Sequence, residues 1–362
     1  MKKVLLAAGG TGGHIFPMVS LYKGLEVSGN SILLVTDNRV ENYIKNLNIN
    51  FKIIDASSPY KDKNIIKKIL NIFLILKSSI QSFCILKKFK PDLVIGCGGY
   101  VSFSVLAISK ILKIKYIIYE TNSVMGRVNK FFSKSALKIF TGYKLPIGLK
   151  NENFFKTEFI GQLVRKNFFK ISYFIPQNLN NFFNLMILGG SQGAKIFSKV
   201  VPEVLGKLLN EKYKINIFHQ CNENDIDFLK SNYSKFTNSF NFKYEIFSFE
   251  PNIEKFYEKT NLVICRAGSS TLAELSIIGI PFITIPLPSS LDNHQYLNAK
   301  YYADNECAYL INQDLHIEKN LYLTLKNFLT SKQDDIKQKS NNLQNLHKFD
   351  SLKVFTNFIN KI

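Results

Sequence analysis

Continuous apolar runs alternate along the chain with longer segments of helical periodicity. An apolar run without internal alternation is typical of a parallel strand that is buried on both faces of its sheet. Helices between such strands predict an α/β doubly wound architecture. The runs that predict strands are Val4–Ala8, Ser31–Thr36, Leu93–Gly96, Tyr116–Tyr119, Leu185–Leu188, Ile215–His219, Leu262–Cys265 and Pro281–Ile285.

Two of these predicted strands end in the same kind of glycine-rich turn. Gly9–His14 follows the first run, and Gly189–Ala194 follows Leu185–Leu188 in the second half of the chain. A strand, a tight glycine turn and a helix start direct backbone N–H groups and a helix dipole at an anion, usually a phosphate. Two copies therefore predict two nucleotide-fold halves that face one another across a cleft.

A length of 362 residues suits two domains, each large enough for its own core. We expect an N-terminal domain over residues 1–160 and a C-terminal domain over 161–344, with Phe159–Pro176 as the crossover. The polar segments Asn151–Lys156 and Gln177–Asn184 predict loops. From about Asp334 the tail predicts a charged helix with an apolar rear face.

Composition places the chain among globular proteins, with 46% apolar and 20% charged residues. Five scattered cysteines have no CxxC spacing, so we expect no zinc site and a reduced compartment. The apolar start Val4–Ala8 is too short for a signal peptide, and no run approaches the roughly 18 apolar residues of a membrane-spanning helix. The protein is expected to be soluble or to lie on a membrane surface.

Basic residues concentrate in the first half of a chain whose net charge is +20. Residues 1–160 contain 24 Lys and Arg against 9 Asp and Glu, whereas residues 161–362 contain 23 against 18. This asymmetry fits an anionic partner of the first half, either nucleic acid or an acidic membrane surface. Lysine is the default basic residue of this chain, so an arginine marks a position that needs the planar guanidinium group with its forked N–H donors. The four arginines are Arg39, Arg127, Arg165 and Arg266.

The segment 64–90 predicts a long, basic and very apolar helix that carries Lys67, Lys68 and Lys77. Two interpretations are open. The helix packs in the core while its lysines extend to solvent, or it lies on a membrane with its apolar face in the acyl boundary and its lysines on lipid phosphates. The charge excess of the first half favours the membrane interpretation.

His14 stands in the first turn of the helix after the first glycine turn. The positive end of the helix dipole disfavours protonation of its imidazole. A neutral imidazole in a glycine-lined cleft is a candidate general base, and the alternative is a histidine that only caps or packs. The turn lacks the ending of a P-loop and is not followed by an acidic residue that would hold a ribose, which argues against an ATPase or an NAD enzyme.

In the second half, Ser191 and Gln192 could hold a diphosphate with the backbone amides of their turn, unless the turn binds no ligand. A third strand–turn–helix junction lies at Arg266–Glu274. Glu274 either completes a capping box with Thr271 or accepts hydrogen bonds from ribose hydroxyls. A polar cluster, Asp292–Gln295, follows the next strand. All these groups are expected at carboxyl ends of strands, where ligands bind in such sheets.

The chain resembles the peptidoglycan N-acetylglucosaminyltransferases of the MurG family, inverting GT-B glycosyltransferases that convert lipid I to lipid II. The resemblance runs almost end to end, and eight motifs in the same order make it specific. They are Gly9–Pro17 (GGTGGHIFP), Gly96–Ser102 (GCGGYVS), Glu120–Asn129 (ETNSVMGRVN), Gly161–Arg165 (GQLVR), Gly189–Ala194 (GGSQGA), His219-Gln220, Arg266–Glu274 (RAGSSTLAE) and Asp292–Ala299 (DNHQYLNA).

This resemblance implies a GT-B fold of two Rossmann-like domains and a last helix, 345–362, that packs back on the N-terminal domain. It implies UDP-N-acetylglucosamine (UDP-GlcNAc) as the donor, lipid I as the acceptor and His14 as the base. On the donor side and in the cleft it implies Thr11, Gly12, Gly13, Asn122, Arg165, Gly190, Ser191, Gln192, Phe249, Glu250, Ser269, Ser270, Thr271, Leu272, Glu274, His294 and Gln295. On the acceptor side it implies Gly98, Gly99, Tyr100 and Ser102.

Within that set, uracil is expected near Phe249 and Glu250, and ribose at Glu274. The diphosphate is expected at Ser191, Gln192 and Arg165, and the sugar near His294, Gln295 and Asn122. The reaction is expected to need no cofactor and no catalytic metal, because helix N-termini and an arginine can stabilise the leaving diphosphate and no acidic pair lies near these turns.

The resemblance also implies a peripheral enzyme on the cytoplasmic face of the bacterial inner membrane. Its partners would be an anionic membrane surface and other cell-wall synthesis proteins, and not nucleic acid. Thr121, Gln162-Leu163, Asn222 and Glu250 depart from the usual family residues without removing a proposed catalytic group. The rival classes are another GT-B sugar transferase, a UDP-sugar epimerase and a nucleic-acid-binding protein.

Overall fold

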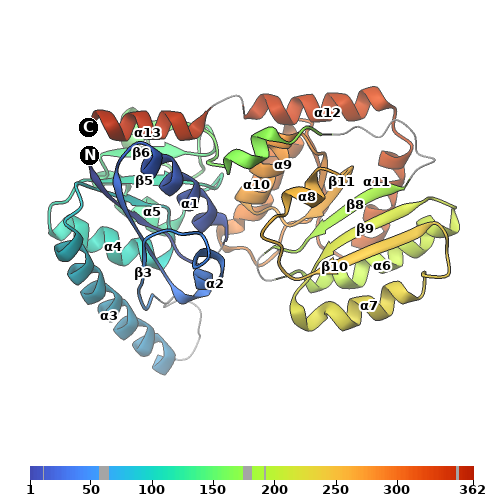
Figure 1. Ribbon diagram of the computed structural model, residues 1–362, viewed down its shortest axis with the longest axis horizontal. Helices are drawn as coiled ribbons and strands as arrows, with labels where there is room; N and C mark the ends of the chain where they lie inside the picture. Colours follow the sequence, from blue (N-terminus) through green and yellow to red (C-terminus); the bar gives the residue numbers. More distant parts are fainter. Residues whose placement is uncertain (11, 57–64, 174–181, 191–192, 348–349) are drawn as a thin grey trace. The chain divides into compact units, whose positions relative to one another are not determined.

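The computed structural model describes residues 1–10, 12–56, 65–173, 182–190, 193–347 and 350–362, and it describes no side chains at 42–43, 65–70 and 72. The chain forms two units, each built around a parallel sheet (Figure 1). Unit 1 consists of Met1–Arg165 and Phe349–Ile362, and unit 2 consists of Lys166–Lys348. The doubly wound α/β architecture predicted from the apolar runs is therefore confirmed.

Unit 1 has a seven-stranded sheet in the order β3-β2-β1-β4-β5-β6-β7, and every pairing is parallel. The first strand explains why the runs are continuous. Val4 and Leu6 face one layer of helices while Leu5 and Ala7 face the other, so all four are buried. The strands are β1 (Lys3–Ala7), β2 (Ser31–Thr36), β3 (Phe51–Ile53), β4 (Leu93–Gly96), β5 (Tyr116–Glu120), β6 (Lys138–Thr141) and β7 (Thr157–Phe159).

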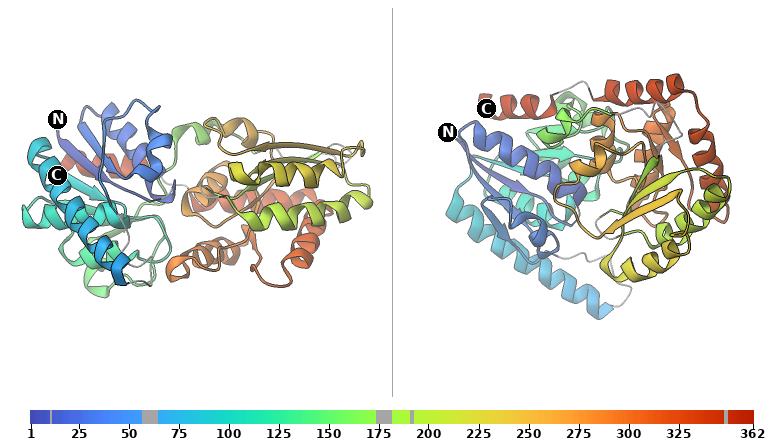
Figure 2. Two further views of the ribbon diagram at one scale, coloured as in Figure 1. Left: turned by 90° about the horizontal axis from the view of Figure 1, so that it is seen from below. Right: turned by 45° about the vertical axis from the view of Figure 1, so that its right-hand side comes forward.

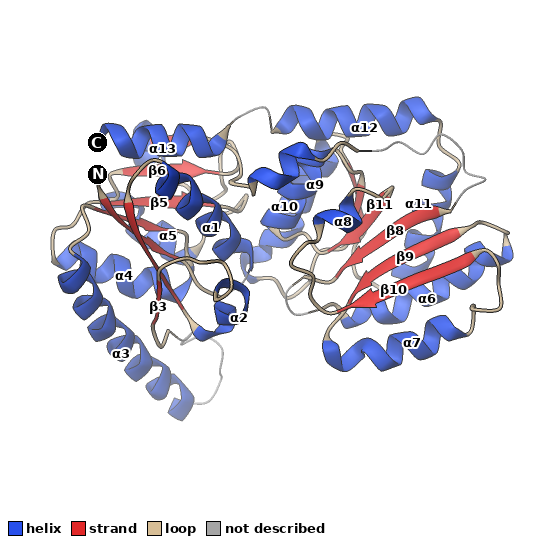
Figure 3. Cartoon of the chain, in the orientation of Figure 1, coloured by secondary structure: helices blue, strands red, loops and turns tan. Residues whose placement is uncertain are grey.

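Helices cover both faces of this sheet (Figure 3). The C-terminal helix α13 (Ser351–Lys361) packs beside α1 (Gly12–Val27) on one face, where Phe355 and Ile359 are fully buried. Helices α3 (Ile65–Phe89), α4 (Gly99–Ile111) and α5 (Arg127–Phe132) lie on the other face. Short helical segments complete the unit: η1 (Asn38–Val40), α2 (Glu41–Ile44), η2 (Ser133–Ser135) and η3 (Asn151–Lys156).

Unit 2 has a six-stranded parallel sheet in the order β10-β9-β8-β11-β12-β13. Its strands are β8 (Phe183–Leu188), β9 (Ile215–Gln220), β10 (Phe242–Phe247), β11 (Leu262–Cys265), β12 (Phe282–Thr284) and β13 (Ala308–Leu310). Its helices are η4 (Lys166–Lys170), α6 (Lys195–Asn210), η5 (Glu223–Asp225), α7 (Ile226–Ser234), α8 (Glu254–Tyr257), α9 (Ser269–Ile278), η6 (Leu291–Asn293), α10 (His294–Asp304), α11 (Ile317–Leu329) and α12 (Gln333–Leu346).

Two local expectations differ from the structure. The tail is not one helix from Asp334 onwards, because α12 ends at Leu346 and packs on α9, whereas α13 begins at Ser351 and packs on α1. The loop expected at Asn151–Lys156 forms successive 3-10 turns. Residues 177–181 of the second expected loop lie outside the described residues, and β8 begins at Phe183, earlier than the predicted strand.

Strand order reverses at one place in each sheet. In unit 1 the chain departs in opposite directions from the neighbouring strands β1 and β4, and in unit 2 from β8 and β11. Ligands of doubly wound sheets bind beyond the carboxyl ends of such a strand pair. Both glycine turns of the sequence follow a strand at a reversal point: the Gly9 turn follows β1, and the Gly189 turn follows β8.

Candidate functional site

The Gly9 turn of unit 1 is closely surrounded by side chains from other elements. A Cβ atom at Gly9 would lie 2.4 Å from Oδ2 of Asp37 and 2.4 Å from Cγ2 of Val101. The next residue, Gly10, has a φ of +95°, which a residue with a side chain rarely adopts. Gly9 is therefore needed for Asp37, which follows β2, and Val101 of α4 to approach the end of β1, and Gly10 is needed for the backbone conformation of the turn.

His14 contacts this turn from the first turn of α1. Its Nδ1 atom lies 3.3 Å from the carbonyl oxygen of Gly9. In the tautomer in which Nδ1 donates to that oxygen, Nε2 is the basic nitrogen of the ring. Gly12 and Gly13 form the start of the same helix turn, and Thr11 lies outside the described residues. The arrangement gives the imidazole a fixed orientation, as a general base requires.

The second turn of unit 1 begins α4 and lies against the same imidazole. Gly98 and Gly99 have φ values of +92° and +77°, and a Cβ atom at Gly98 would lie 3.6 Å from Nε2 of His14. Tyr100 is half-buried in the first turn of α4. Ser102 is fully buried, and its hydroxyl donates to the carbonyl of Ala7 at 2.7 Å. That hydroxyl joins α4 to β1.

Glu120, at the end of β5, organises the loop that carries Asn122. Its buried carboxylate accepts hydrogen bonds from the backbone N–H of Asn122 at 3.0 Å, the backbone N–H of Gly126 at 2.8 Å and Nδ2 of Asn129 at 2.8 Å. Burial raises the pKa of Glu120, while these donors oppose the shift. Sequence reasoning gave Glu120 no role; the available signal was a carboxylate at the end of a buried apolar strand.

Arg165 is the last residue of the first segment of unit 1, Met1–Arg165. Its guanidinium lies over the ring of Phe16 on α1, 5.7 Å from the ring centroid. This distance is within the range of a cation–π contact. Arg165 is half-buried, so the structure holds its side chain near the helix that carries His14.

The Gly189 turn of unit 2 closes on its own backbone. A Cβ atom at Gly189 would lie 2.5 Å from the backbone nitrogen of Ala194. Gly190 and Gly193 have φ values of +77° and +66°. Ser191 and Gln192, the residues expected to hold a diphosphate, lie outside the described residues. The described glycines form a tight bend directly before α6, as expected for an anion cradle.

Helix α9 begins at Ser269 with Gly268 as its N-cap, and no side chain caps it. The capping-box interpretation of Thr271 and Glu274 is therefore wrong, because Thr271 is already inside the first turn. Ser269 and Leu272 are buried, while Ser270 and Thr271 are half-buried. Glu274 is 8% exposed and accepts a hydrogen bond from the hydroxyl of Tyr257 at 3.4 Å.

His294 and Gln295 follow two consecutive residues with left-handed backbone, Asp292 (φ 51°) and Asn293 (φ 55°). Nδ1 of His294 lies 2.8 Å from the carbonyl of Leu291. Oε1 of Gln295 accepts from the backbone N–H of Leu287 at 3.0 Å, which aims the amide NH2 away from that loop. Non-glycine residues in this conformation store strain, a feature that clusters at ligand sites.

Phe249 and Glu250 lie in the loop after β10. The Phe249 side chain is 48% exposed. The Glu250 carboxylate pairs with Lys255 and accepts from the backbone N–H of Asn252 at 2.8 Å, and these two contacts lower the pKa of Glu250. Its side chain is thus used within its own loop.

Arg266 has a structural role in unit 2. Its Nη1 atom donates to the carbonyl oxygens of Ile285 at 2.8 Å and Pro286 at 3.1 Å. Burial lowers the pKa of its guanidinium to about 10. The arginine therefore holds the loop after β12 against the turn after β11.

Comparisons with known proteins cover both units. Residues 4–141 match the glycosyltransferase family 28 N-terminal domain, and residues 184–354 match the family 28 C-terminal domain. The UDP-N-acetylglucosamine–N-acetylmuramyl-(pentapeptide) pyrophosphoryl-undecaprenol N-acetylglucosamine transferase of Rickettsia bellii is 38% identical over 323 residues, 87% of each chain. The enzyme of the same name from Pelagibacter ubique is 38% identical over 347 residues, 94% of this chain and 93% of the relative. The chain belongs to the MurG family of glycosyltransferases.

The solved structures agree with the sequence relatives of this family. MurG of Acinetobacter baumannii superposes with a TM-score of 0.77 at 25% identity, with full coverage of both chains. The fold is therefore GT-B, as the resemblance implied, and the chain is a glycosyltransferase. Family membership decides against the epimerase and the nucleic-acid-binding interpretations of the sequence.

Helix α3 forms a surface of unit 1 that is separate from the glycine turns. Helix α3 lies beside α4 at the margin of the unit (Figures 1 and 2). Its inner face carries the buried serines Ser78 and Ser82, and the hydroxyl of Ser78 lies 2.6 Å from that of Ser104 on α4. Its outer face exposes an apolar stripe, which we define as Phe73, Leu76, Ile80 and Phe83.

This stripe inverts the usual order of an amphipathic helix, in which apolar side chains face the core. The middle of the helix therefore packs on α4 through small polar side chains and presents the stripe to solvent, whereas Leu86 near its end is buried in the core. Lys77 forms an ion pair with Asp55 at 2.8 Å, and Lys87 lies over the ring of Phe83. The side chains of Lys67 and Lys68 are outside the described residues. Among the described helices, none is long and apolar enough to cross a membrane.

Within the described residues, no group of three or more His, Cys, Asp or Glu side chains is placed to hold a metal ion. The cysteines of the chain are free: Cys97, Cys221, Cys265 and Cys307 are buried, and Cys84 is exposed on α3.

Proposed function

We propose that the protein transfers N-acetylglucosamine from UDP-GlcNAc to the 4-hydroxyl of the N-acetylmuramic acid of lipid I, with inversion, and so makes lipid II for peptidoglycan. The enzymes named for this transfer in Rickettsia bellii and Pelagibacter ubique support the reaction. The geometry of His14, held by Gly9 and flanked by Gly98, supports the chemistry.

In the proposed reaction the acceptor oxygen attacks C1 of the donor sugar as the bond from C1 to the UDP oxygen breaks. The hydroxyl proton passes to Nε2 of His14, and UDP leaves with the electron pair of the broken bond. Inversion follows because one displacement occurs at C1. A positioned base of this kind contributes about 10²- to 10⁴-fold to the rate.

The groups of unit 2 are proposed to hold the donor. Glu274 accepts from the ribose hydroxyls, the loop of Phe249 and Glu250 reads uracil through its backbone, and His294 and Gln295 bind the sugar. Ser191, Gln192 and the N-terminus of α6 would hold the diphosphate together with Arg165. These donors support a reaction without a metal, since they can stabilise the charge that develops on UDP.

The deciding experiment measures transfer of labelled N-acetylglucosamine from UDP-GlcNAc to a soluble lipid I analogue, with EDTA present. The expected product is the disaccharide analogue at the same rate with and without EDTA. If no product forms either with EDTA or with an added divalent ion, the proposed function is wrong. A rate that requires added Mg²⁺ would overturn metal independence alone.

A second proposal concerns location: the protein binds the anionic cytoplasmic surface of the inner membrane through the α3 stripe. Apolar side chains outside and lysines at the borders fit insertion into the boundary between acyl chains and headgroups. The excess of basic residues in the first half supports an anionic surface. Partners among cell-wall synthesis proteins stay a prediction.

Vesicle sedimentation tests this location. The variant F73S/I80S should bind vesicles with anionic phospholipids at least tenfold more weakly, since burying one such side chain contributes about 1.5–3 kcal/mol. The matched control is Val27→Ser, which removes an exposed apolar side chain from the end of α1, away from the stripe. Equal binding by F73S/I80S and V27S would exclude the stripe as the membrane contact.

A further inference from the structure

An aspartate and an arginine form a rigid pair directly after β2. Asp37, whose side chain is 5% exposed, accepts hydrogen bonds from Nε of Arg39 at 2.9 Å and from Nη2 at 2.7 Å. Its Oδ1 atom also accepts from the backbone N–H of Arg39 at 3.0 Å. Two parallel bonds between a guanidinium and a carboxylate fix both the position and the plane of the arginine fork.

This pair lies on the Gly9 turn. A Cβ atom at Gly10 would lie 3.3 Å from Nη2 of Arg39 and 3.5 Å from Nη1, while one at Gly9 would lie 2.4 Å from Oδ2 of Asp37. The two glycines thus accommodate the carboxylate and the guanidinium respectively. The arginine fork lies beside the start of α1, within the turn that also orients His14.

The pair leaves half of the guanidinium available for another ligand. Asp37 uses the edge formed by Nε and Nη2, and the second edge, formed by Nη1 and Nη2, has the spacing that matches two oxygens of a phosphate. Within the described part of the chain, the hydrogen bonds of this guanidinium are those to Asp37. The Arg39 side chain is 48% exposed, whereas the Asp37 side chain that holds it is 5% exposed.

Stability alone does not explain this construction. A pair with one half-exposed partner contributes at most about 1 kcal/mol, and a buried carboxylate must be desolvated to form it. The chain uses lysine for 43 of its 47 basic residues, but it has arginine here. A planar, bidentate donor that is pre-oriented by a buried carboxylate is typical of phosphate recognition.

We propose that Arg39 binds the diphosphate that joins the acceptor sugar to its carrier lipid, and that Asp37 is its positioning residue. The proposal rests on the proposed function, in which both substrates carry a diphosphate. The donor diphosphate is assigned to the turn of unit 2 and to Arg165. Arg39 shares the turn of His14, which takes the proton of the acceptor hydroxyl, so its phosphate is that of the acceptor.

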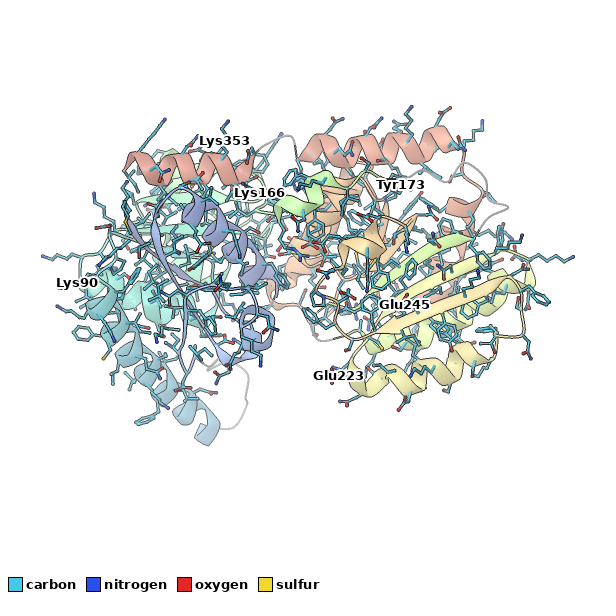
Figure 4. All side chains as sticks on the ribbon, in the orientation of Figure 1. Lys90, Lys166, Tyr173, Glu223, Glu245 and Lys353 are labelled. Carbon is cyan, nitrogen blue, oxygen red and sulfur yellow. The ribbon has the colours of Figure 1, made fainter. Side chains whose placement is uncertain are left out.

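A binding experiment without turnover tests this assignment. The probe is geranyl diphosphate, a short prenyl diphosphate, titrated in the presence of saturating UDP so that the donor site is filled. We compare the wild type with Arg39→Gln, Arg39→Lys and Asp37→Asn. The matched control is Lys353→Gln, which removes one exposed positive charge from α13 of the same unit (Figure 4).

The expected loss of affinity in R39Q is about ten- to hundredfold, the range for a hydrogen bond to a charged group. R39K keeps the positive charge without the planar fork, and D37N keeps the fork without the carboxylate that orients it, so both should lose less affinity than R39Q. K353Q should bind as the wild type does. The melting temperature of each variant shows that it folds. Equal affinities of wild type and R39Q would overturn the proposal.

A kinetic arm distinguishes the two diphosphates. With a soluble lipid I analogue, R39Q should raise KM for the acceptor about tenfold or more while KM for UDP-GlcNAc stays within about twofold. An increase confined to the KM for UDP-GlcNAc would overturn the proposal and place Arg39 at the donor. Absence of transfer by the wild type would count against the proposed function, whereas the prenyl diphosphate titration decides the role of Arg39 independently.

Discussion

The two glycine turns look alike in sequence but are built differently. At Gly9, the atoms that exclude a side chain belong to Asp37 and Val101, which come from other elements. At Gly189, the excluding atoms belong to Gly193 and Ala194 of the same turn. The first glycine makes room for neighbours, and the second lets the backbone close on itself.

This difference separates the chemistry of the two units. The first turn gathers side chains, namely His14, the Asp37–Arg39 pair and the start of α4. The described residues of the second turn, Gly189, Gly190 and Gly193, form a tight bend before the N-terminus of α6. A proton-transfer site needs a titratable side chain, whereas an anion cradle needs only dipoles. One sequence pattern can therefore serve either purpose, and its surroundings decide which.

The largest effect should come from removing the side chain at the first turn. His14→Ala should lower kcat about 10³-fold, because it removes the proposed base. UDP affinity, measured by titration calorimetry, should stay within about twofold, because the groups proposed to bind UDP are Arg165 and residues of unit 2, and not His14. A variant that loses UDP affinity and keeps kcat would place His14 on the donor side and remove the contrast between the turns.

A substitution in the second turn should lower the affinity for UDP. Gly189→Ala places a Cβ atom 2.5 Å from the backbone nitrogen of Ala194, so the turn must open. Overpacking of this kind costs about 1–3 kcal/mol, and UDP affinity should fall up to about a hundredfold. Gly206→Ala on α6 is the control, since its new atom would meet only the Phe236 ring at 3.3 Å. Unchanged UDP affinity in G189A would exclude the turn as the diphosphate cradle.

Glu274 tests whether unit 2 also uses a side chain. Glu274→Ala should weaken UDP binding about thirtyfold, the effect of losing hydrogen bonds to a charged group. Tyr257→Phe is the control, because it removes the 3.4 Å hydrogen bond to Oε2 and leaves the carboxylate. If E274A lowers the melting temperature but not UDP affinity, the carboxylate serves only the packing of α9.

The smallest effect concerns a buried histidine of unit 2. His219 is fully buried with Nδ1 2.7 Å from the Tyr233 hydroxyl, and burial lowers its pKa from 6.5 to about 3. His219 therefore binds a proton more readily in the unfolded chain than in the folded one. The free energy of unfolding decreases as pH falls below 6.5. From pH 7.5 to 5.5 this loss is about 1.4 kcal/mol.

Urea unfolding of unit 2 in wild type and His219→Gln measures that loss. The stability of the wild type relative to H219Q should fall by about 1.4 kcal/mol between the two pH values. Other acid-sensitive groups, such as buried His347, are common to both proteins and cancel. A constant difference between the two proteins would show that folding does not lower the pKa of His219.

The apolar pattern predicted the interior of both sheets better than their margins. The predicted strands agree with β1, β2, β4, β5, β8, β9, β11 and β12, which are inner strands, to within a few residues at each end. All four edge strands were missed: β3, β7, β10 and β13, together with β6 beside an edge. Edge strands keep one side near solvent, so their sequences mix charged and apolar residues, as in Phe242–Phe247.

The residues of the candidate site were likewise predicted only in part. Glycine turns and His14 could be found from sequence because their spacing along the chain is local. The partners Asp37 and Glu120 could not, since their contacts depend on which loops meet at the carboxyl ends of β1, β2, β4 and β5. Arg39 was marked only by being one of four arginines in a lysine-rich chain.

Helix α13 has a consequence for biosynthesis. Phe355 and Ile359, fully buried on the α1 face of the unit 1 sheet, are synthesised after every strand of both units. The core of the first unit thus lacks two of its side chains until translation of this segment is complete, while every strand of the second unit is already made. The unit that is synthesised first should be the last to reach its native state.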